Sequence, residues 1–292
     1  MKGDTPLISA VKKNNLDAVE LLMSLGADFN ARCRHNHTSL ILASYRGYTE
    51  IVKSLIDAGV DLNLKNNSGD TALISASQEG YTEIVKLLID AGAELNLDDN
   101  GKNTALITAS RCEHTKIVKL LISAGANLNL QNDDGDAALV VASYRGYTEI
   151  SKLLIDAGAE LNLRNCCRYT ALIIASQEGH VDIVKLLINA GAKLNLQDRR
   201  RHTALILASY HGHSETSKLL IDAGADLNLQ NWFGDTALIL ASYHGRTAIV
   251  KLLIDAGAKL NLQNGSRNTA LILASYHRRT AIVNMLKAAG AY

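Results

Sequence analysis

The sequence contains few of the residues that usually fill the core of a globular protein and shape its loops. Of its 292 residues, two are Phe, one is Trp and one is Pro, and aromatic residues make up only 4%. Interior volume must therefore come from Leu, Ile, Val and Ala, within an apolar fraction of 47%. That fraction is too high for an intrinsically disordered chain, and the composition is neither collagen-like nor of low complexity.

Further absences concern membranes and disulfides. No run of about 18 apolar residues could span a bilayer, and the polar first residues lack the apolar core of a secretory signal. The chain has four cysteines (Cys33, Cys112, Cys166 and Cys167), too few for a disulfide framework. We therefore expect a cytoplasmic protein without membrane insertion, located in a host cytosol if it is a secreted effector.

The formal net charge of +1 hides a gradient along the chain. Residues 1–164 carry 16 basic and 21 acidic side chains, a net charge of −5, whereas residues 165–292 carry 14 and 8, a net charge of +6. Such a bipolar chain can present opposite fields to two partners or stack head to tail.

A short motif, Thr-x-Leu or a close variant, recurs every 33 residues without insertion or deletion. It begins at Thr5, Thr38, Thr71, Thr104, Ala137, Thr170, Thr203, Thr236 and Thr269. A period of this length is the signature of a repeat architecture. We expect one elongated array over residues 1–292, with a capping repeat at 1–32, seven internal repeats over 33–263 and a second capping repeat at 264–292.

One unit, residues 66–98, predicts two short helices. Thr71 and Thr82 suit the N-cap positions of helices over 72–79 and 83–91, because a threonine hydroxyl can accept a free backbone N–H. Glycines that can take the left-handed conformation follow the helices, at Gly80 and Gly92. Residues 95–97 are expected to run extended into a polar turn.

The second helix of this unit is apolar on most of its surface, so it needs neighbours on several sides. A 33-residue unit cannot bury that surface alone, whereas stacked units can, as in a solenoid. The sequence therefore predicts an all-helical solenoid. In the last repeat Lys287 replaces an Ile that repeats 2–8 share, which is expected of a terminal cap.

The repeat resembles the ankyrin repeat family over the whole chain. The resemblance rests on Thr5-Pro6-Leu7, on Gly-Tyr or Gly-His pairs such as Gly80-Tyr81, and on the runs Ile84–Ile89 and Ala91–Asn96. It implies helix-turn-helix units joined by β-turn fingers, with a concave face that binds protein partners. Most repeats read Thr-Ala-Leu-Ile where the family has Thr-Pro-Leu-His, so the proline-first helix start and the histidine that ties neighbouring repeats are missing.

Variation is concentrated in two places of an otherwise constant repeat: the turn before each Thr, and the pair of residues that ends the first helix. In ankyrin-like proteins both places line the concave face. Tyr, Trp and Arg are enriched at binding hot spots. The candidate binding residues are Tyr45, Arg46, Arg111, Tyr144, Arg145, Tyr169, Arg199, Arg200, Tyr210, His211, Trp232, Phe233, Tyr243, His244, Tyr276 and His277.

The alternative for these positions is drift, or the residue of a 99-residue duplication, since Tyr-Arg and Gln-Glu pairs recur three repeats apart. Trp232-Phe233 is interpreted as a partner anchor, with packing on a neighbouring turn as the alternative. The run Arg199–Arg201, with Arg168, Arg267 and Arg278-Arg279, favours an acidic or phosphorylated peptide, although a solvated charged face gives the same pattern.

The function predicted is a non-enzymatic protein–protein interaction scaffold, a monomer that binds a protein or peptide of unknown identity. A second hypothesis is a nucleic-acid-binding module, because Tyr210, Tyr243 and Tyr276 could stack on bases. A third is an engineered, consensus-like scaffold without a natural partner.

Chemistry-bearing motifs are few, so no catalytic residue and no cofactor are predicted. The sequence has no phosphate-binding loop with lysine, no His-Glu-x-x-His and no nucleophile elbow. Cys33, His35 and His37 alternate along one turn, but a closed zinc site needs four ligands and the next turn offers only Asn67 and Ser68, so no metal is expected. Cys166 and Cys167 are expected to be thiols rather than a vicinal disulfide.

Two recurring residues receive other roles. An Asn repeats at Asn63, Asn96, Asn129, Asn162, Asn195, Asn228 and Asn261, and is expected to stabilise its own turn through local side-chain hydrogen bonds. The histidines at His211, His244 and His277 are expected to make binding of an acidic partner respond to pH.

Overall fold

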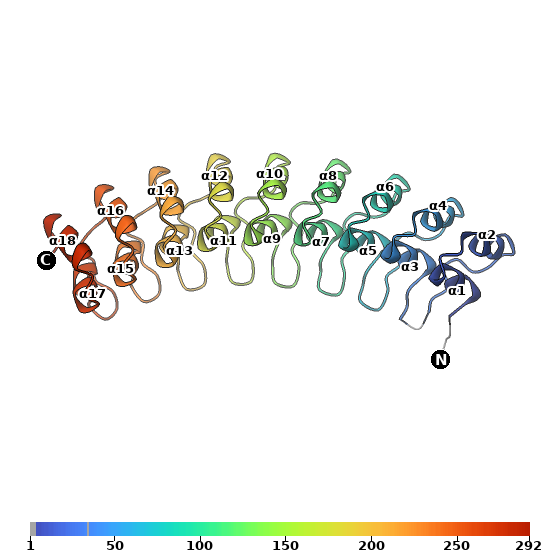
Figure 1. Ribbon diagram of the computed structural model, residues 1–292, viewed down its shortest axis with the longest axis horizontal. Coiled ribbons are helices and arrows are strands. Elements are labelled where there is room, and N and C mark those ends of the chain that lie inside the picture. Colours follow the sequence, from blue (N-terminus) through green and yellow to red (C-terminus); the bar gives the residue numbers. More distant parts are fainter. Residues whose placement is uncertain (1–3, 34) are drawn as a thin grey trace. The chain divides into compact units, whose positions relative to one another are not determined.

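The computed structural model describes residues 4–33 and 35–292, which form eighteen helices arranged in consecutive pairs (Figure 1). The described residues contain no β-strand, and one isolated bridge joins Asp98 and Thr104. The chain divides into two compact units, residues 1–138 and 139–292. The all-helical repeat fold predicted from the sequence is confirmed.

Each unit is built from inner helices, which are odd-numbered, and outer helices, which are even-numbered. Residues 1–138 contain α1 (Pro6–Lys12), α2 (Leu16–Ser24), α3 (Ser39–Arg46), α4 (Thr49–Asp57), α5 (Ala72–Glu79), α6 (Thr82–Asp90), α7 (Ala105–Arg111) and α8 (Thr115–Ser123). Helix α9 (Ala138–Arg145) begins at the boundary. Residues 139–292 continue with α10 (Thr148–Asp156), α11 (Ala171–Glu178), α12 (Val181–Asn189), α13 (Ala204–His211), α14 (Ser214–Asp222), α15 (Ala237–Tyr243), α16 (Thr247–Asp255), α17 (Ala270–Tyr276) and α18 (Thr280–Ala288).

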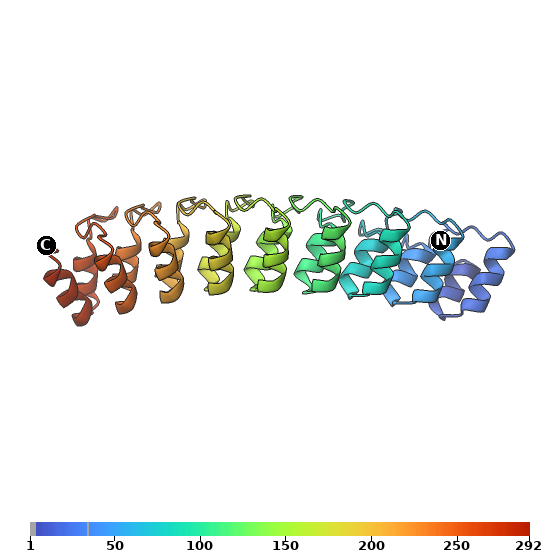
Figure 2. The same ribbon diagram turned by 90° about the horizontal axis from the view of Figure 1, so that it is seen from above.

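Within each unit, inner helices pack on inner helices and outer helices on outer helices, so consecutive pairs lie side by side (Figure 2). The loops that connect one pair to the next, here called fingers, project beyond the inner helices (Figure 1). None of the helices in the described part of the chain is long and apolar enough to cross a bilayer.

The threonine of the repeat motif caps the inner helix as predicted. The Thr71 hydroxyl accepts a hydrogen bond from the Ile74 N–H at 3.2 Å, and the same bond recurs in repeats from Thr5 to Thr269. Gly80 then ends α5 in the left-handed conformation, with φ +83°. A methyl group at the matching Gly47 would lie 2.7 Å from the ring of Tyr81, so the glycine also admits a side chain of the next repeat.

Two details of the predicted unit are wrong. Thr82 is not an N-cap: it is the first residue of α6, whose N-cap, Tyr81, makes no side-chain capping bond. The reason is the tight connection after Gly80, in which the Tyr81 N–H bonds back to the Ala76 carbonyl at 3.1 Å. Leu95 and Asn96 form a turn rather than an extended segment.

The interior is aliphatic, as the composition indicates. Leu73, Ile74, Ile84 and Leu88 are each at most 1% exposed. Their counterparts in the other internal repeats are buried too, with Thr216 in place of Ile84, whereas in the last repeat Ile272 is 46% exposed. Among the described residues no aromatic side chain is buried. The few rings of this protein are therefore left for its surface.

The repeating asparagines act between repeats rather than within their own turn, which corrects the prediction. The Asn63 side-chain oxygen accepts a hydrogen bond from the Glu94 N–H of the next repeat at 3.0 Å. The same bond links Asn195 to Asp226 at 2.9 Å and Asn228 to Lys259 at 2.8 Å. The side chain that closes the local turn is instead the aspartate or asparagine two positions earlier, such as Asp61.

A second link between repeats comes from the residue after the mid-repeat glycine, whose place Glu113 takes in the fourth repeat. The Nε2 atom of His114 lies 3.0 Å from the Gln78 carbonyl oxygen, and His213 contacts that of Gln177 at 2.9 Å. The family's tying histidine is absent from its usual motif, but a histidine at this other position bridges neighbouring repeats here.

Helix α14 contains polar residues where the other outer helices are mostly aliphatic, and we expect a weak layer there. Thr216 and Ser217 take the place of the buried Ile84 and Val85, are 0% exposed, and have hydroxyls with no hydrogen-bond partner. We expect faster amide hydrogen exchange in residues 203–224 than in residues 71–92, because local opening costs least where burial is least favourable. Equal protection of the two segments, measured by mass spectrometry, would contradict this expectation.

Candidate functional site

The candidate site is supported by the fingers of residues 139–292. The first residue of each finger accepts two backbone hydrogen bonds with one side-chain oxygen: Asn231 Oδ1 accepts from the N–H groups of Phe233 and Asp235, both at 2.9 Å. Asp198 does the same at 2.8 and 2.7 Å. These bonds hold the finger backbone in place without any contribution from the side chains at the tip.

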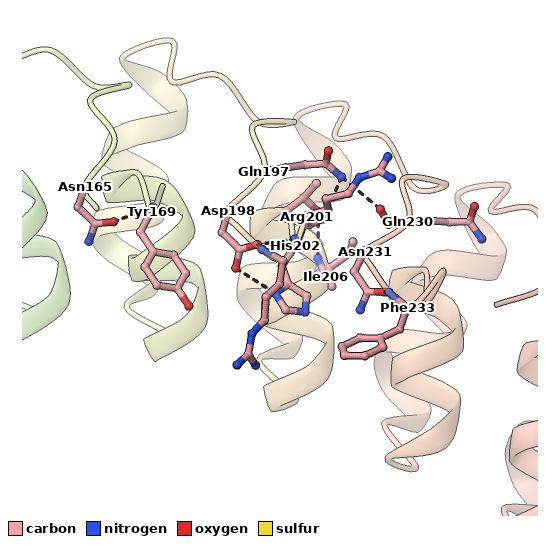
Figure 3. A network of polar contacts seen from close by, with 12 residues as sticks. Asn165, Tyr169, Gln197, Asp198, Arg201, His202, Ile206, Gln230, Asn231 and Phe233 are labelled. Atoms are coloured by element: carbon pink, nitrogen blue, oxygen red, sulfur yellow. Dashed lines mark hydrogen bonds and ion pairs between the residues drawn. The ribbon is translucent and has the colours of Figure 1, made fainter. Parts of the chain in front are cut away.

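Neighbouring fingers are also joined to one another through their backbones. The Trp232 N–H donates to the Arg200 carbonyl at 2.9 Å, and the Gly265 N–H donates to the Phe233 carbonyl at 2.8 Å. The amide of Gln197 adds a further link, since Nε2 donates to the carbonyls of Arg201 at 2.8 Å and of Gln230 at 3.2 Å (Figure 3). The fingers therefore form a row joined by hydrogen bonds, and this row supports the side chains at the tips.

Asp198 and His202 form a largely buried ionisable pair in this row. Asp198 is 3% exposed, and its Oδ2 lies 2.9 Å from His202 Nδ1 (Figure 3). Burial would raise the pKa of Asp198, but hydrogen bonds from the His202 side chain and backbone outweigh it and hold the pKa below its ordinary value. The carboxylate thus stays ionised and acts as a structural brace for the finger.

Two exposed rings lie at the tip of the next finger. Trp232 is 74% exposed and Phe233 65% exposed, so neither ring is covered by a neighbouring turn. Together with Arg200 they border an open hollow on the finger row. Exposed aromatic rings of this size are typical of contact surfaces.

Two adjacent hollows lie between the fingers and the inner helices α11, α13, α15 and α17. The first has a volume of about 390 Å³ and is lined by Tyr169, Arg200, Tyr210, Phe233 and Leu240, among others. The second, of about 350 Å³, shares Tyr210, Asp235 and Leu240 with the first and adds Tyr243, His244 and Leu273. We call these two hollows the aromatic groove. Their volumes fall in the range of ligand-binding pockets.

Tyr169 contributes a hydroxyl to the first hollow. Burial, and then the nearby Asp198 carboxylate, raise the pKa of this phenol above its ordinary value. The hydroxyl therefore remains protonated over the whole physiological range and is available as a hydrogen-bond donor.

Beside the groove, six rings form a continuous edge-to-face series. Tyr210 contacts His211 and His244, Tyr243 contacts His244 and His277, and Tyr276 contacts His277, with centroid distances between 4.4 and 5.1 Å. We call this series the ring ladder; it comprises His211, Tyr210, His244, Tyr243, His277 and Tyr276. Each ring is held by its neighbours, so the ladder is preorganised.

Two histidines of the ladder have lowered pKa values. Burial, and then the neighbouring His213, lower the pKa of His211; burial, and then Arg246, lower the pKa of His244. Both imidazoles are therefore neutral at pH 7, when each can donate one hydrogen bond and accept another.

The remaining predicted residues are distributed over the two units. In residues 1–138, Tyr45 and Arg46 are exposed at the end of α3, and Arg111 bonds to the Asn103 side chain at 3.4 Å. In residues 139–292, Tyr144 and Arg145 are exposed at the end of α9 and do not line the aromatic groove. Arg199 is exposed at its fingertip, and Arg34, another variable turn residue, lies outside the described residues.

The turn with Cys33, His35 and His37 contains no cluster of metal ligands among its described residues. Cys33 is buried, and the rings of His35 and His37 lie 6.3 Å apart at right angles. Among the residues that the structure describes, no three His, Cys, Asp or Glu side chains could hold one ion. No disulfide joins Cys166 and Cys167, which are both exposed.

Sequence reasoning missed the floor of the groove. Leu240 and Leu273 occupy a place that is buried in earlier repeats, as at Leu207, and they are half-buried here. Asp235, which borders both hollows, was also missed because it follows the variable tip. The signal was available in part, since this position changes from Tyr169 to His202 to Asp235 along the array.

Family models of the ankyrin repeat match almost the entire chain. A model of three consecutive ankyrin repeats matches residues 40–132, 94–165, 139–231 and 205–292, and a single-repeat model matches residues 2–34. A comparison with curated proteins returned no significant match.

Proposed function

The chain belongs to the ankyrin repeat family, and we propose that it is a non-enzymatic scaffold that binds a protein or peptide segment in the aromatic groove of residues 139–292. Ankyrin repeats are in general protein–protein interaction modules, and proteins built from them are typically not enzymes. The groove is formed by the fingers and inner helices, which in ankyrin-like proteins line the concave binding face.

The observation that carries the proposal is the placement of rings. Trp232, Phe233, Tyr210 and Tyr243 are all exposed, and three of them border the same pair of hollows. Large exposed rings around a preformed apolar depression provide the anchors that dominate interface energetics.

Charge supports an acidic or phosphorylated partner. Residues 165–292 carry a net charge of +6, and Arg199, Arg200 and Arg201 are exposed on one finger beside the groove. Guanidinium groups form bidentate hydrogen bonds to carboxylate and phosphate, which adds orientation to attraction.

Selection from a displayed random-peptide library tests the proposal. We expect enriched peptides whose affinity falls by about ten-fold or more on Tyr210→Ala/Phe233→Ala. Lys218→Ala, on the outer helix α14, serves as the matched control and should leave affinity unchanged. Selected peptides that bind all three proteins equally would contradict the assignment of the groove.

Salt dependence separates this proposal from nucleic-acid binding. A binder of the phosphate backbone loses affinity by orders of magnitude between about 50 and 200 mM salt. The peptide groove is expected to lose far less, because its anchors are apolar rings.

Acidification is expected to tighten the binding of an acidic peptide. Because the pKa values of His211 and His244 are lowered in the free protein, their protonation, and hence the tightening, begins below their ordinary value of 6.5. Calorimetric affinities at about pH 5.5 and 8 measure the effect, and His211→Gln/His244→Gln should remove it. Equal affinities at the two pH values would contradict the role of these histidines.

A further inference from the structure

We propose that the preferred occupant of the aromatic groove is a proline-rich segment in the polyproline II conformation, with prolines three residues apart, lying along Tyr210, Tyr243 and Tyr276. This inference rests on the proposed function, since it names the class of peptide that the groove takes.

The spacing of the tyrosines carries the first step. Two ring contacts of 4.6 Å each, through His244, connect Tyr210 with Tyr243. Contacts of 4.4 and 5.1 Å, through His277, connect Tyr243 with Tyr276. These steps set an upper bound on the separation of successive tyrosine rings, and that bound is about one turn of a polyproline II helix, which advances ~9.3 Å in three residues. A segment with this period meets each tyrosine in the same way.

The shape of the groove carries the second step. The surface beside Tyr210 and Tyr243 is hollowed, with Leu240 lining both hollows and Leu273 lining the second. A proline ring is compact and apolar, and it fills such a hollow with little loss of conformational entropy because its backbone is already restricted. Aromatic-lined grooves bind proline-rich segments in this manner.

Hydrogen bonding carries the third step, because three side-chain oxygens that border the groove already accept hydrogen bonds from the fingers. Asn231 Oδ1 accepts two backbone N–H groups, and Asn264 Oδ1 accepts those of Ser266 and Asn268 at 3.0 Å. Asp235 Oδ1 accepts from Asn264 Nδ2 at 2.7 Å. Proline has no N–H, so a proline-rich segment needs fewer acceptors from the groove than an ordinary extended peptide, which brings an N–H at every residue.

The groove instead offers donors. Tyr169, Tyr210, Tyr243 and Arg200, whose side chains end in hydroxyl or guanidinium donors, line the two hollows. A polyproline II backbone makes no internal hydrogen bonds, so its carbonyl groups are available as acceptors along its whole length. The chemistry of the wall and that of the segment are therefore complementary.

The test compares two labelled peptides by fluorescence anisotropy against the full chain. Both have the same composition, with acidic residues at one end, and differ only in proline spacing: every third residue in one, alternating gaps of two and four in the other. We expect the period-three peptide to bind about ten-fold more tightly. Tyr243→Ala should remove that preference, while Tyr243→Phe, which keeps the ring, should retain most of it.

Circular dichroism of each variant serves to check that its helical array is intact. Equal affinity of the two peptides, lost in both cases on Arg200→Ala/Phe233→Ala, would overturn the proline inference while leaving peptide binding in the groove established. Absence of binding by either peptide also overturns it, and the library selection then decides the proposed function separately. A period-three preference that survives Tyr243→Ala would place the segment elsewhere and overturn the inference as well.

Discussion

Replacing Thr216 by Ile and Ser217 by Val is expected to raise the free energy of unfolding by about 2–4 kcal/mol. Both side chains are fully buried in α14, and neither hydroxyl has a hydrogen-bond partner. A buried hydroxyl without a partner costs about 1–3 kcal/mol of desolvation. The matching residues of α6, Ile84 and Val85, occupy the same layer with no exposed surface, so the larger side chains fit this environment.

Urea denaturation of the parent chain and the double variant measures the difference. Ser151→Val, at the matching buried position of α10, should give about half the gain, because Ser151 also lacks a partner. Thr280→Val, at an exposed position, should stay within about 0.5 kcal/mol of the parent. A double variant no more stable than the parent would show that these hydroxyls are satisfied in solution.

Gly234→Ala is expected to destabilise the protein by about 2–4 kcal/mol and to weaken binding in the aromatic groove by about ten-fold. Gly234 has a φ of +79°, and a methyl group there would lie 2.7 Å from the backbone nitrogen of Gly265. That nitrogen donates the hydrogen bond to the Phe233 carbonyl, so the two fingers must separate to admit the methyl group.

Gly224→Ala is the matched control. Its φ is +86°, but a methyl group meets no atom within 4 Å. It should therefore cost only the left-handed backbone penalty, about 1–2 kcal/mol, and leave peptide affinity unchanged. Thermal unfolding measures the stability of both variants, and anisotropy titrations measure their affinity for peptide. Equal effects of the two substitutions on affinity would mean that the finger contact does not position Phe233.

The repeat period made most of the fold predictable. Once Thr71 and Gly80 are placed as the start and end signals of one helix, the same signals recur at fixed distances, and the structure confirms helix α5 at Ala72–Glu79. Thr82 was misplaced because threonine is a good N-cap in general, and the sequence does not show that the Tyr81 backbone already closes the connection.

The candidate site was predictable in part. The exposure of Trp232 and Phe233 followed from their position at a variable turn, because internal repeats show which positions the fold does not constrain. The reach of Asn63 to Glu94, and the ring contacts of Tyr210 with His244, could not be derived in the same way. They depend on how one repeat is rotated against the next, a quantity that no residue within a single repeat encodes.

The residues that hold the finger backbones in place by hydrogen bonds are not the residues whose side chains form the exposed surface at the tips. At the finger that begins with Asn231, the hydrogen bonds that hold the backbone are made by the Asn231 and Gln230 side-chain amides and by backbone groups, whereas the side chains of Trp232 and Phe233 take no part in them. A tip can therefore change its chemistry without changing its position. Evolution, or a laboratory library, can revise partner preference one tip at a time while the scaffold beneath is inherited unaltered.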